Sequence, residues 1–207
     1  MRPYTERLLP WLIETILSRP TYAEQRRTLL CRAEGRVLEI GFGFGGTLLE
    51  YKAARVRVLI ALEPNPGMLR RARGRIARAP FPIRLVRGVA EAMPFLPGTF
   101  DTVVSNWTLC TIGRLPDALR EIRRVMAGGG RFLFLEHGLS REPRLARWQR
   151  LLTPVQRVLA GGCRLDLDME NVVRLAGFQM ESLERYESGL PLRVLRQMYR
   201  GIARVRP

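Results

Sequence analysis

The sequence predicts an α/β fold built on a doubly wound, mostly parallel sheet with an antiparallel pair of strands at its C-terminal edge. Short apolar runs of strand length alternate with amphipathic stretches of helix length from residue 36 to residue 136. This alternation is typical of parallel strands joined by right-handed crossover helices. Beyond Gly177 two strand-like runs follow each other without a helix between them, which indicates the antiparallel pair.

The expected elements follow this pattern along the chain. Residues 5–30 hold two amphipathic helical stretches separated by Pro20. Buried strands are expected at 36–40, 57–62, 83–87, 99–105 and 131–136. Helices are expected at 47–53, 68–79 and 116–126, and glycines at 128–130 end the last of these.

The C-terminal part departs from this alternation. A basic helix over 145–160, broken or bent at Pro154, precedes a helix over 169–176 that Gly177 ends. Strands at 180–186 and 198–205 would form the antiparallel edge. The chain is long enough for one domain, which consists of a helical lead-in (1–34), a ligand-binding core (35–138) and cover helices with terminal strands (139–207).

The composition excludes several classes of protein. With 46% hydrophobic and 26% charged residues, the chain is typical of a globular domain, and no apolar run approaches the ~20 residues of a membrane span. The start of the sequence lacks the pattern of a signal peptide, so we expect a cytoplasmic protein. Three scattered cysteines and one histidine predict neither a disulfide framework nor a metal site.

The net charge of +16 favours anionic partners, whether nucleic acid, an anionic membrane or an acidic small molecule. It does not choose among them. Arginine supplies nearly all of the positive charge, and Lys52 is the one lysine. A GC-rich genome would produce the same bias, so the charge alone indicates no mechanism.

A glycine-rich turn marks the predicted ligand site. Gly41, Gly43 and Gly45 follow the first strand, where a ligand can approach the main chain without meeting a Cβ. Glu39 precedes the turn, and Glu63 ends the second strand, where a Rossmann-like sheet places a carboxylate that binds ribose hydroxyls. The alternative role for Glu63 is a helix-initiating charge, which its position after the glycine turn disfavours.

Two further segments complete a set of motifs, namely 88–95, which contains Ala90-Glu91, and 98–105, which leads into the fourth strand. With the glycine turn and Glu63, they resemble class I S-adenosylmethionine-dependent methyltransferases, in particular the branch of the quinone-biosynthesis C-methyltransferases. The resemblance covers residues 36–138. It implies one Rossmann-like methyltransferase domain with S-adenosyl-L-methionine as the cofactor.

The resemblance also implies roles for individual residues. Glu39 would lie near the methionine amino group, and Glu63 would bind the ribose. Val89 stands where many relatives carry an aspartate for the adenine amino group, so adenine recognition would depend on the backbone and on packing. The other residues expected to line the cofactor are Gly41, Phe42, Gly43, Gly45, Pro64, Met68, Ala90, Glu91, Ser105, Asn106 and Trp107.

His137, at the end of the fifth strand, is the candidate catalytic residue. Its imidazole is suited to accept a proton from the nucleophile, and it is equally suited to a hydrogen bond with a neighbouring loop; position alone leaves both readings open. The methyl group of a sulfonium is already activated. The protein therefore needs above all to align a small-molecule acceptor and to exclude water.

A second resemblance indicates the acceptor. Several segments look like the methyltransferase-like thiol S-methyltransferases, which are membrane-associated enzymes that methylate small alkyl thiols: 106–110, 136–137, 148–149, Pro154 and 162–163. A thiol with a pKa of ~8.5 is partly ionised near neutrality, so a sparse site is sufficient. A quinone or a phospholipid headgroup is the alternative acceptor. Cys110 and Cys163 are expected to be buried and inert.

The helix over 145–160 presents apolar residues on one face, with arginines at 144, 147, 150 and 157. We expect it to cover the substrate pocket, and weak contact with an anionic membrane surface is compatible with that role. The same positive charge suits an RNA methyltransferase. However, the run at 105–108 is not the Asn/Asp-Pro-Pro-aromatic run of base N-methylation, so nucleic acid is not the expected partner.

The sequence leaves two alternatives to a methyltransferase open. One is a protein that binds the cofactor without catalysis, and the other is a nicotinamide dehydrogenase, which carries a related glycine turn. The oligomeric state and the identity of the acceptor are left open.

Overall fold

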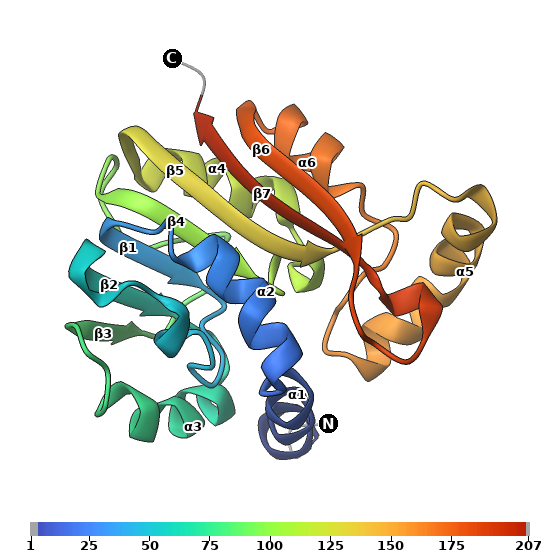
Figure 1. Cartoon of the computed structure of the whole chain (residues 1–207), viewed down its shortest axis with the longest axis horizontal. Coiled ribbons are helices and arrows are strands. Elements are labelled where there is room, and N and C mark those ends of the chain that lie inside the picture. Colours follow the sequence, from blue (N-terminus) through green and yellow to red (C-terminus); the bar gives the residue numbers. More distant parts are fainter. Residues whose placement is uncertain (1–3, 206–207) are drawn as a thin grey trace.

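The computed structural model describes residues 4–205, which form one sheet with helices on both faces (Figure 1). The strands are β1 (Gly35–Ile40), β2 (Val56–Leu62), β3 (Ile83–Val86), β4 (Phe100–Asn106), β5 (Met126–His137), β6 (Phe178–Glu187) and β7 (Gln197–Val205). Their order in the sheet is β3-β2-β1-β4-β5-β7-β6. Strands β1 to β5 pair in parallel, and β7 runs antiparallel to β5 and β6. The predicted fold class and its antiparallel edge are therefore confirmed.

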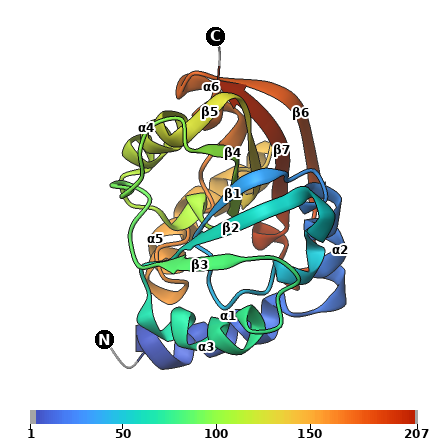
Figure 2. The same ribbon diagram turned by 90° about the vertical axis from the view of Figure 1, so that its left-hand side faces the viewer.

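The helical segments are the π-helical turn η1 (Tyr4–Leu8) and α1 (Leu9–Leu17), α2 (Pro20–Leu30), α3 (Pro66–Ile76), α4 (Leu115–Val125), α5 (Pro143–Leu159) and α6 (Met169–Leu175). Four of them form two layers on the sheet. Helices α2 and α3 cover one face of the sheet, whereas α4 and α6 cover the other (Figure 2). Each layer encloses its own apolar core.

The central strands supply both cores because successive side chains point to opposite faces of a sheet. Leu38 and Ile40 of β1 enter the core under α4 and α6, and Val37 enters the core under α2 and α3. In β4, Val103 and Val104 divide in the same way. Burial on both faces explains why these strands read as continuous apolar runs in the sequence.

The helix expected at 47–53 does not form. Two short 3-10 turns, η2 (Leu48–Glu50) and η3 (Ala53–Arg55), take its place, and Tyr51 between them has extended backbone. Side-chain contacts hold this segment: the hydroxyls of Thr47 and Tyr51 both donate to Glu39, and Glu50 pairs with Arg26. A helix this short is marginal by itself, so these tertiary contacts decide its shape.

Two other boundaries differ from the prediction. Strand β5 begins at Met126, which pairs with Phe100, so the glycines at 128–130 lie in an irregular strand start and do not precede the strand. Helix α3 begins at Pro66, because the side chain of Asn65 accepts hydrogen bonds from the N–H groups of Gly67 and Met68.

Helix α5 continues without a break from Pro143 to Leu159, and Pro154 lies inside it. Pro154 is exposed, so water can satisfy the carbonyl that loses its helical partner. Helix α6 ends at Leu175, and Gly177, two positions further on, has a φ of +85°, the left-handed conformation of a glycine cap. Over residues 4–205, no helix is both long enough and apolar enough to span a bilayer.

The sheet order positions the site. Strand β1 lies between β2 and β4, so the chain moves outward from β1 first in one direction and then in the other. At such a switch point the loops after the two neighbouring strands separate and leave a crevice at the carboxyl ends of the strands. The predicted glycine turn follows β1 at this point.

Candidate active site

A cavity of about 380 Å³ opens at the carboxyl ends of β1, β2 and β4. This volume lies in the range of small-molecule sites. Most of the residues predicted from the sequence line it: Glu39, Gly41, Phe42, Gly43, Glu63, Pro64, Met68, Val89, Ala90, Glu91, Asn106 and Trp107. The fold thus brings together segments that are far apart in the sequence.

Three predicted residues do not line this cavity. Gly45 lies in the glycine turn with a φ of +75°, and Ser105 is buried and donates a hydrogen bond to Glu136 at 2.6 Å. His137 lies behind the wall, where its ring packs against the indole of Trp107 with a centroid distance of 4.4 Å. His137 therefore has no direct access to the cavity in this structure.

Sequence reasoning missed three groups of lining residues. The first group is an apolar roof from α1: Leu9, Pro10, Ile13 and Leu17. The second is the buried Arg26. The third comes from the loop after β4 and from the two residues that follow α5: Thr108, Thr111, Ile112, Gly113, Ala160 and Gly161. The helical spacing of the roof residues is visible in the sequence, but nothing there places α1 over the sheet. Of α5 and the loop behind it, only Ala160 and Gly161 reach the cavity.

The glycine turn is shaped for a close ligand. Gly41 and Gly43 have φ values of +63° and +61°, which glycine adopts without strain. A Cβ at Gly41 would meet the side-chain oxygen of Thr108 at 2.2 Å. A Cβ at Gly43 would approach only the carbonyl oxygen of Gly41, at 3.8 Å, and would otherwise take up space inside the cavity. The main chain at Gly43 is therefore open to a bound molecule.

Glu63 supports this turn from the end of β2. Its Oε2 accepts a hydrogen bond from the N–H of Gly43 at 2.8 Å, and its Oε1 accepts one from the N–H of Asn65 at 2.8 Å. Burial raises the pKa of Glu63, while these two backbone donors oppose that rise. The carboxylate is held rigidly, and its remaining lone pairs are available to hydroxyl donors in the cavity.

Glu39 is a second carboxyl group in the cavity wall. Its Oε2 accepts hydrogen bonds from Tyr51, at 2.9 Å, and from Thr47, at 3.0 Å. Burial raises the pKa of Glu39 to about 8, against the lowering effect of the two hydroxyl donors. A cation placed beside this group would favour its ionised form. Glu39 is thus suited to a positively charged ligand.

The charges that line the cavity oppose those of the whole chain. Among the described lining residues, Glu39, Glu63 and Glu91 provide carboxyl groups, and Arg26 provides the one guanidinium. Arg26 is paired with the buried Glu50 at 2.9 Å. A chain with a net charge of +16 therefore presents an acidic cavity. Such a cavity favours a cationic ligand over the pyrophosphate of a nicotinamide cofactor.

Glu136 organises the loop after β4. This fully buried carboxylate accepts hydrogen bonds from the hydroxyl of Ser105 and from the backbone N–H groups of three successive residues, Thr108, Leu109 and Cys110. These three residues form the start of the 3-10 turn η4 (Leu109–Thr111). Glu136 therefore fixes the loop that carries Trp107 and Thr108 into the cavity.

Trp107 occupies an unusual position in this loop. Its φ of +57° makes it the one non-glycine residue with a positive φ among residues 4–205. Its indole packs edge to face between Tyr22, at 5.5 Å, and His137. The indole Nε1 is buried without a hydrogen-bond partner within the described part of the chain. Strained backbone of this kind is frequent at functional sites.

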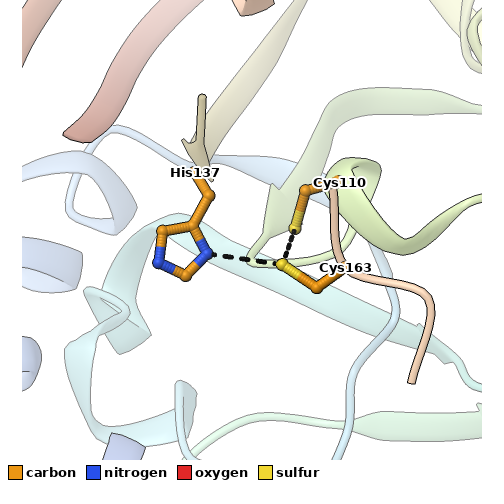
Figure 3. Close-up of side chains that lie close together, drawn as sticks. All are labelled: Cys110, His137 and Cys163. Atoms are coloured by element: carbon orange, nitrogen blue, oxygen red, sulfur yellow. Dashed lines mark hydrogen bonds between the residues drawn. The ribbon is translucent and has the colours of Figure 1, made fainter. Parts of the chain in front are cut away.

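Behind Trp107, His137 meets two cysteines (Figure 3). The Sγ of Cys163 lies 3.7 Å from Nδ1 of His137 and 3.7 Å from the Sγ of Cys110. The pKa of Cys163 is lowered to about 5; the hydrogen bond with Cys110 is the largest cause, and His137 adds to it against the effect of burial. The prediction that both cysteines are buried is confirmed.

Comparisons with known proteins agree with this geometry. Residues 38–134 match a family described as a methyltransferase domain. The chain is 32% identical over 118 residues to an uncharacterized methyltransferase, YcgJ, of Bacillus subtilis; the match covers 56% of this chain and 46% of that protein. It is 28% identical over 171 residues to the human thiol S-methyltransferase TMT1A, and that match covers 81% of this chain and 69% of TMT1A.

Solved structures share the fold. The crystal structure of YcgJ from Bacillus subtilis superposes with a TM-score of 0.65 at 19% identity, over 88% of this chain and 94% of that structure. This chain spans about half the length of the first curated relative that it matches, at 46%. The sequence of residues 38–134 is thus similar to methyltransferase domains, and the fold and the acidic cavity at the glycine turn agree with that similarity.

Proposed function

We propose that this chain transfers a methyl group from S-adenosylmethionine to a small acceptor with an apolar body, and that the nucleophile of the acceptor is a thiol. One observation carries the proposal. The same cavity is lined both by carboxyl groups with glycine backbone and by apolar residues of α1, which include Leu9, Ile13 and Leu17. The first group suits a cationic nucleoside, and the second suits an apolar acceptor.

The residues of the cavity fit the cofactor. The open main chain at Gly43 leaves room for a ligand where a Cβ would project, and Glu63 offers a fixed carboxylate for hydroxyl donors. Glu39 is suited to the ammonium group of the methionine portion. When bound, S-adenosylmethionine supplies a methyl group that its sulfonium already activates. The chain then needs to orient the acceptor and to exclude water.

The lining favours an acceptor that ionises easily. Among the described residues of the cavity wall, neither a histidine nor a cysteine is present to act as a base. A thiol with a pKa of ~8.5 is partly ionised near neutrality without a strong base. The carbon nucleophile of a quinol depends more on removal of a proton from a hydroxyl group, and the nitrogen of an amine depends more on removal of a proton from its ammonium form. The similarity to human thiol S-methyltransferase TMT1A supports the same choice.

The test is an assay with S-adenosylmethionine labelled on its methyl group. The purified chain is incubated separately with alkyl thiols, quinols, phospholipids, amines and RNA, and the labelled product is identified by mass spectrometry. We expect label on the sulfur of alkyl thiols, and more of it as the alkyl chain lengthens. Label on a quinol, phospholipid or RNA but not on thiols would replace the thiol with that acceptor. Tight cofactor binding without any labelled product would contradict the enzymatic function.

We further propose that the protein contacts an anionic membrane surface through an apolar surface on α1 and α5. This apolar surface, to which the preceding turn η1 adds Leu8, consists of exposed residues: Leu8, Trp11, Ile16, Trp148, Leu151, Val155, Val158 and Leu159. The turn η1 adjoins the end of α5 where the hydroxyl of Tyr4 donates to the carbonyl of Leu159. The opposite face of α5, with Leu145, Gln149 and Thr153, is buried.

Charge supports a lipid surface as the partner. The arginines at 144, 147, 150 and 157 of α5 are exposed beside these apolar residues. Basic residues that flank an exposed apolar helix face are typical of helices that lie in an anionic membrane interface. The apolar roof of the cavity is on α1, next to the apolar surface. An acceptor dissolved in lipid would therefore have a short path to the site.

A further inference from the structure

The chain's one histidine and two of its three cysteines meet behind the cavity wall (Figure 3). Cys110 lies in η4 after β4, His137 ends β5, and Cys163 lies between α5 and α6. All three side chains are buried, with exposed fractions of 1%, 6% and 6%. The proposed methyl transfer uses none of them, because none of the three lines the cavity.

The distances within this cluster fit a tetrahedral metal site. The two Sγ atoms are 3.7 Å apart, and Nδ1 of His137 is 3.7 Å from the Sγ of Cys163. All three ligand atoms lie within 4.8 Å of one another. Bonds of ~2.3 Å to sulfur and ~2.0 Å to nitrogen place two ligand atoms of a tetrahedral Zn²⁺ ion ~3.5–3.8 Å apart. Two of the three distances between ligand atoms already have about this length, so small shifts would bring all three atoms around one ion.

We propose that the Sγ atoms of Cys110 and Cys163 and the Nδ1 atom of His137 bind one Zn²⁺ ion. Both cysteines bind the ion as thiolates, and any proton still held by a thiol passes to the buffer, so two thiolates balance the two charges of the metal. This neutrality matters at a buried position, where an uncompensated charge is costly. A Cu⁺ ion would leave one negative charge there, and Mg²⁺ or Ca²⁺ would require oxygen ligands.

The ion would connect three segments that meet only in the folded chain. Thr111, which follows Cys110, lines the cavity. Gly161, two positions before Cys163, lines it too. His137 packs against Trp107, which also lines it. A bound ion would therefore hold this part of the cavity wall in one arrangement. The three protein ligands leave one tetrahedral position for water or another donor.

The rival arrangement is a pair of buried thiols that only hydrogen-bond or that oxidise to a disulfide. The experiment separates these states without an assay of methyl transfer, so it does not depend on the proposed function. The full chain is reduced, freed of metal and titrated with Co²⁺ and then with Zn²⁺. We expect one Co²⁺ per chain with intense thiolate-to-cobalt absorption, its displacement by one Zn²⁺, and a higher Tm for the zinc-loaded protein.

Variants identify the ligands. Cys110→Ser, Cys163→Ser and His137→Gln should each weaken metal binding more than about 100-fold, because even the loss of an outer-shell partner costs about 10- to 100-fold. Cys31→Ser is the matched control, since Cys31 lies outside the cluster. It should bind Zn²⁺ as the wild type does.

Several results would overturn the proposal. They are less than half an equivalent of bound metal in the reduced wild type, a cobalt spectrum without thiolate bands, or an equal loss of binding in Cys31→Ser. A disulfide between Cys110 and Cys163 in protein purified without metal or reductant would favour the rival arrangement. The spectrum of the wild type decides the question even if a ligand variant fails to fold.

Discussion

The Oε2 atom of Glu63 accepts a hydrogen bond of 2.8 Å from the backbone N–H of Gly43, which joins the end of β2 to the glycine turn after β1. The two residues are 20 positions apart in the sequence. Because Glu63 also accepts from Asn65, its carboxylate is fixed before any ligand arrives. The same group therefore shapes the turn and faces the cavity.

The substitution Glu63→Gln tests this double role. Glutamine retains one oxygen that can accept from Gly43, but it loses the charge and an acceptor site. We expect cofactor affinity to fall about 10- to 100-fold, which corresponds to the loss of one charge-assisted hydrogen bond. Calorimetric titration with S-adenosylmethionine measures the change. The exposed Glu24→Gln is the control and should bind normally; unchanged affinity in Glu63→Gln would exclude a ribose contact.

Glu39 should make cofactor binding depend on pH. Burial raises its pKa from an ordinary 4.5 to about 8, so the group is mostly protonated in the free protein at neutral pH. An ammonium group beside it favours the carboxylate, so binding should release a proton and become tighter as pH rises toward 8. Titrations in buffers with different ionisation enthalpies would measure this proton. Its release should disappear in Glu39→Gln, and persistence there would assign the proton to another group.

The same shift predicts how Glu39 affects stability. The folded state holds this proton more tightly than the unfolded state does. The stability that the proton provides is therefore fully present below pH 4.5 and is lost as pH rises through about 8. Glu39→Gln removes the titrating group. As pH rises from 4.5 through about 8, the wild type should therefore lose stability relative to the variant. Urea unfolding at several pH values provides the comparison, and a constant difference would contradict the prediction.

Glu136→Ala should strongly destabilise the protein. The buried carboxylate accepts from Ser105 and from three backbone N–H groups, which would all lose their partner. We expect a loss of about 3 kcal/mol in the free energy of unfolding, and a smaller loss for Glu136→Gln, which keeps an acceptor oxygen. Urea unfolding measures both. As the control, Glu187→Ala at an exposed position should remain within about 0.5 kcal/mol of the wild type. A similarly small effect in Glu136→Ala would show that Glu136 does not hold the loop after β4.

Two glycine substitutions should have opposite effects. Gly41→Ala places a Cβ 2.2 Å from the Thr108 side chain at a φ of +63°, so we expect a loss of about 2 kcal/mol and weaker cofactor binding. Gly74 lies exposed inside α3, with open space where a Cβ would stand. Gly74→Ala should stabilise the helix by about 0.5–1 kcal/mol and leave binding unchanged. Thermal unfolding with and without cofactor compares the pair.

The apolar surface on α1 and α5 predicts binding to anionic vesicles. Trp148→Glu should reduce co-sedimentation with vesicles of phosphatidylcholine and phosphatidylserine about tenfold. The substitution replaces a large apolar contact with a negative charge, which the anionic lipid repels. Leu175→Glu is the matched control, since Leu175 is an exposed apolar residue on α6. Binding of the wild type should weaken with salt. Failure of the wild type to sediment, or equal loss in both variants, would refute the membrane proposal.

Local sequence pattern was enough to predict the α/β class, the strand positions and the glycine turn with Glu39 and Glu63. These features depend on local periodicity and on conformations that glycine adopts most readily, so they can be inferred without knowledge of tertiary contacts. Local pattern was insufficient where distant residues decide the outcome. The segment after the glycine turn looks helical, but Glu39 and Arg26 hold it in short 3-10 turns.

The surroundings of the cofactor turn depend on tertiary structure. The fold places α1 over the cavity and leaves most of α5 exposed, although both are amphipathic in sequence. It also turns His137 away from the cavity and toward Cys163, which lies 26 positions further along the chain and contacts Cys110, 53 positions before it. Such meetings depend on how strands and loops are ordered across the sheet. Composition and spacing indicate the class of sheet but not which loop side chains meet, because side chains from separate loops become neighbours only when the sheet forms.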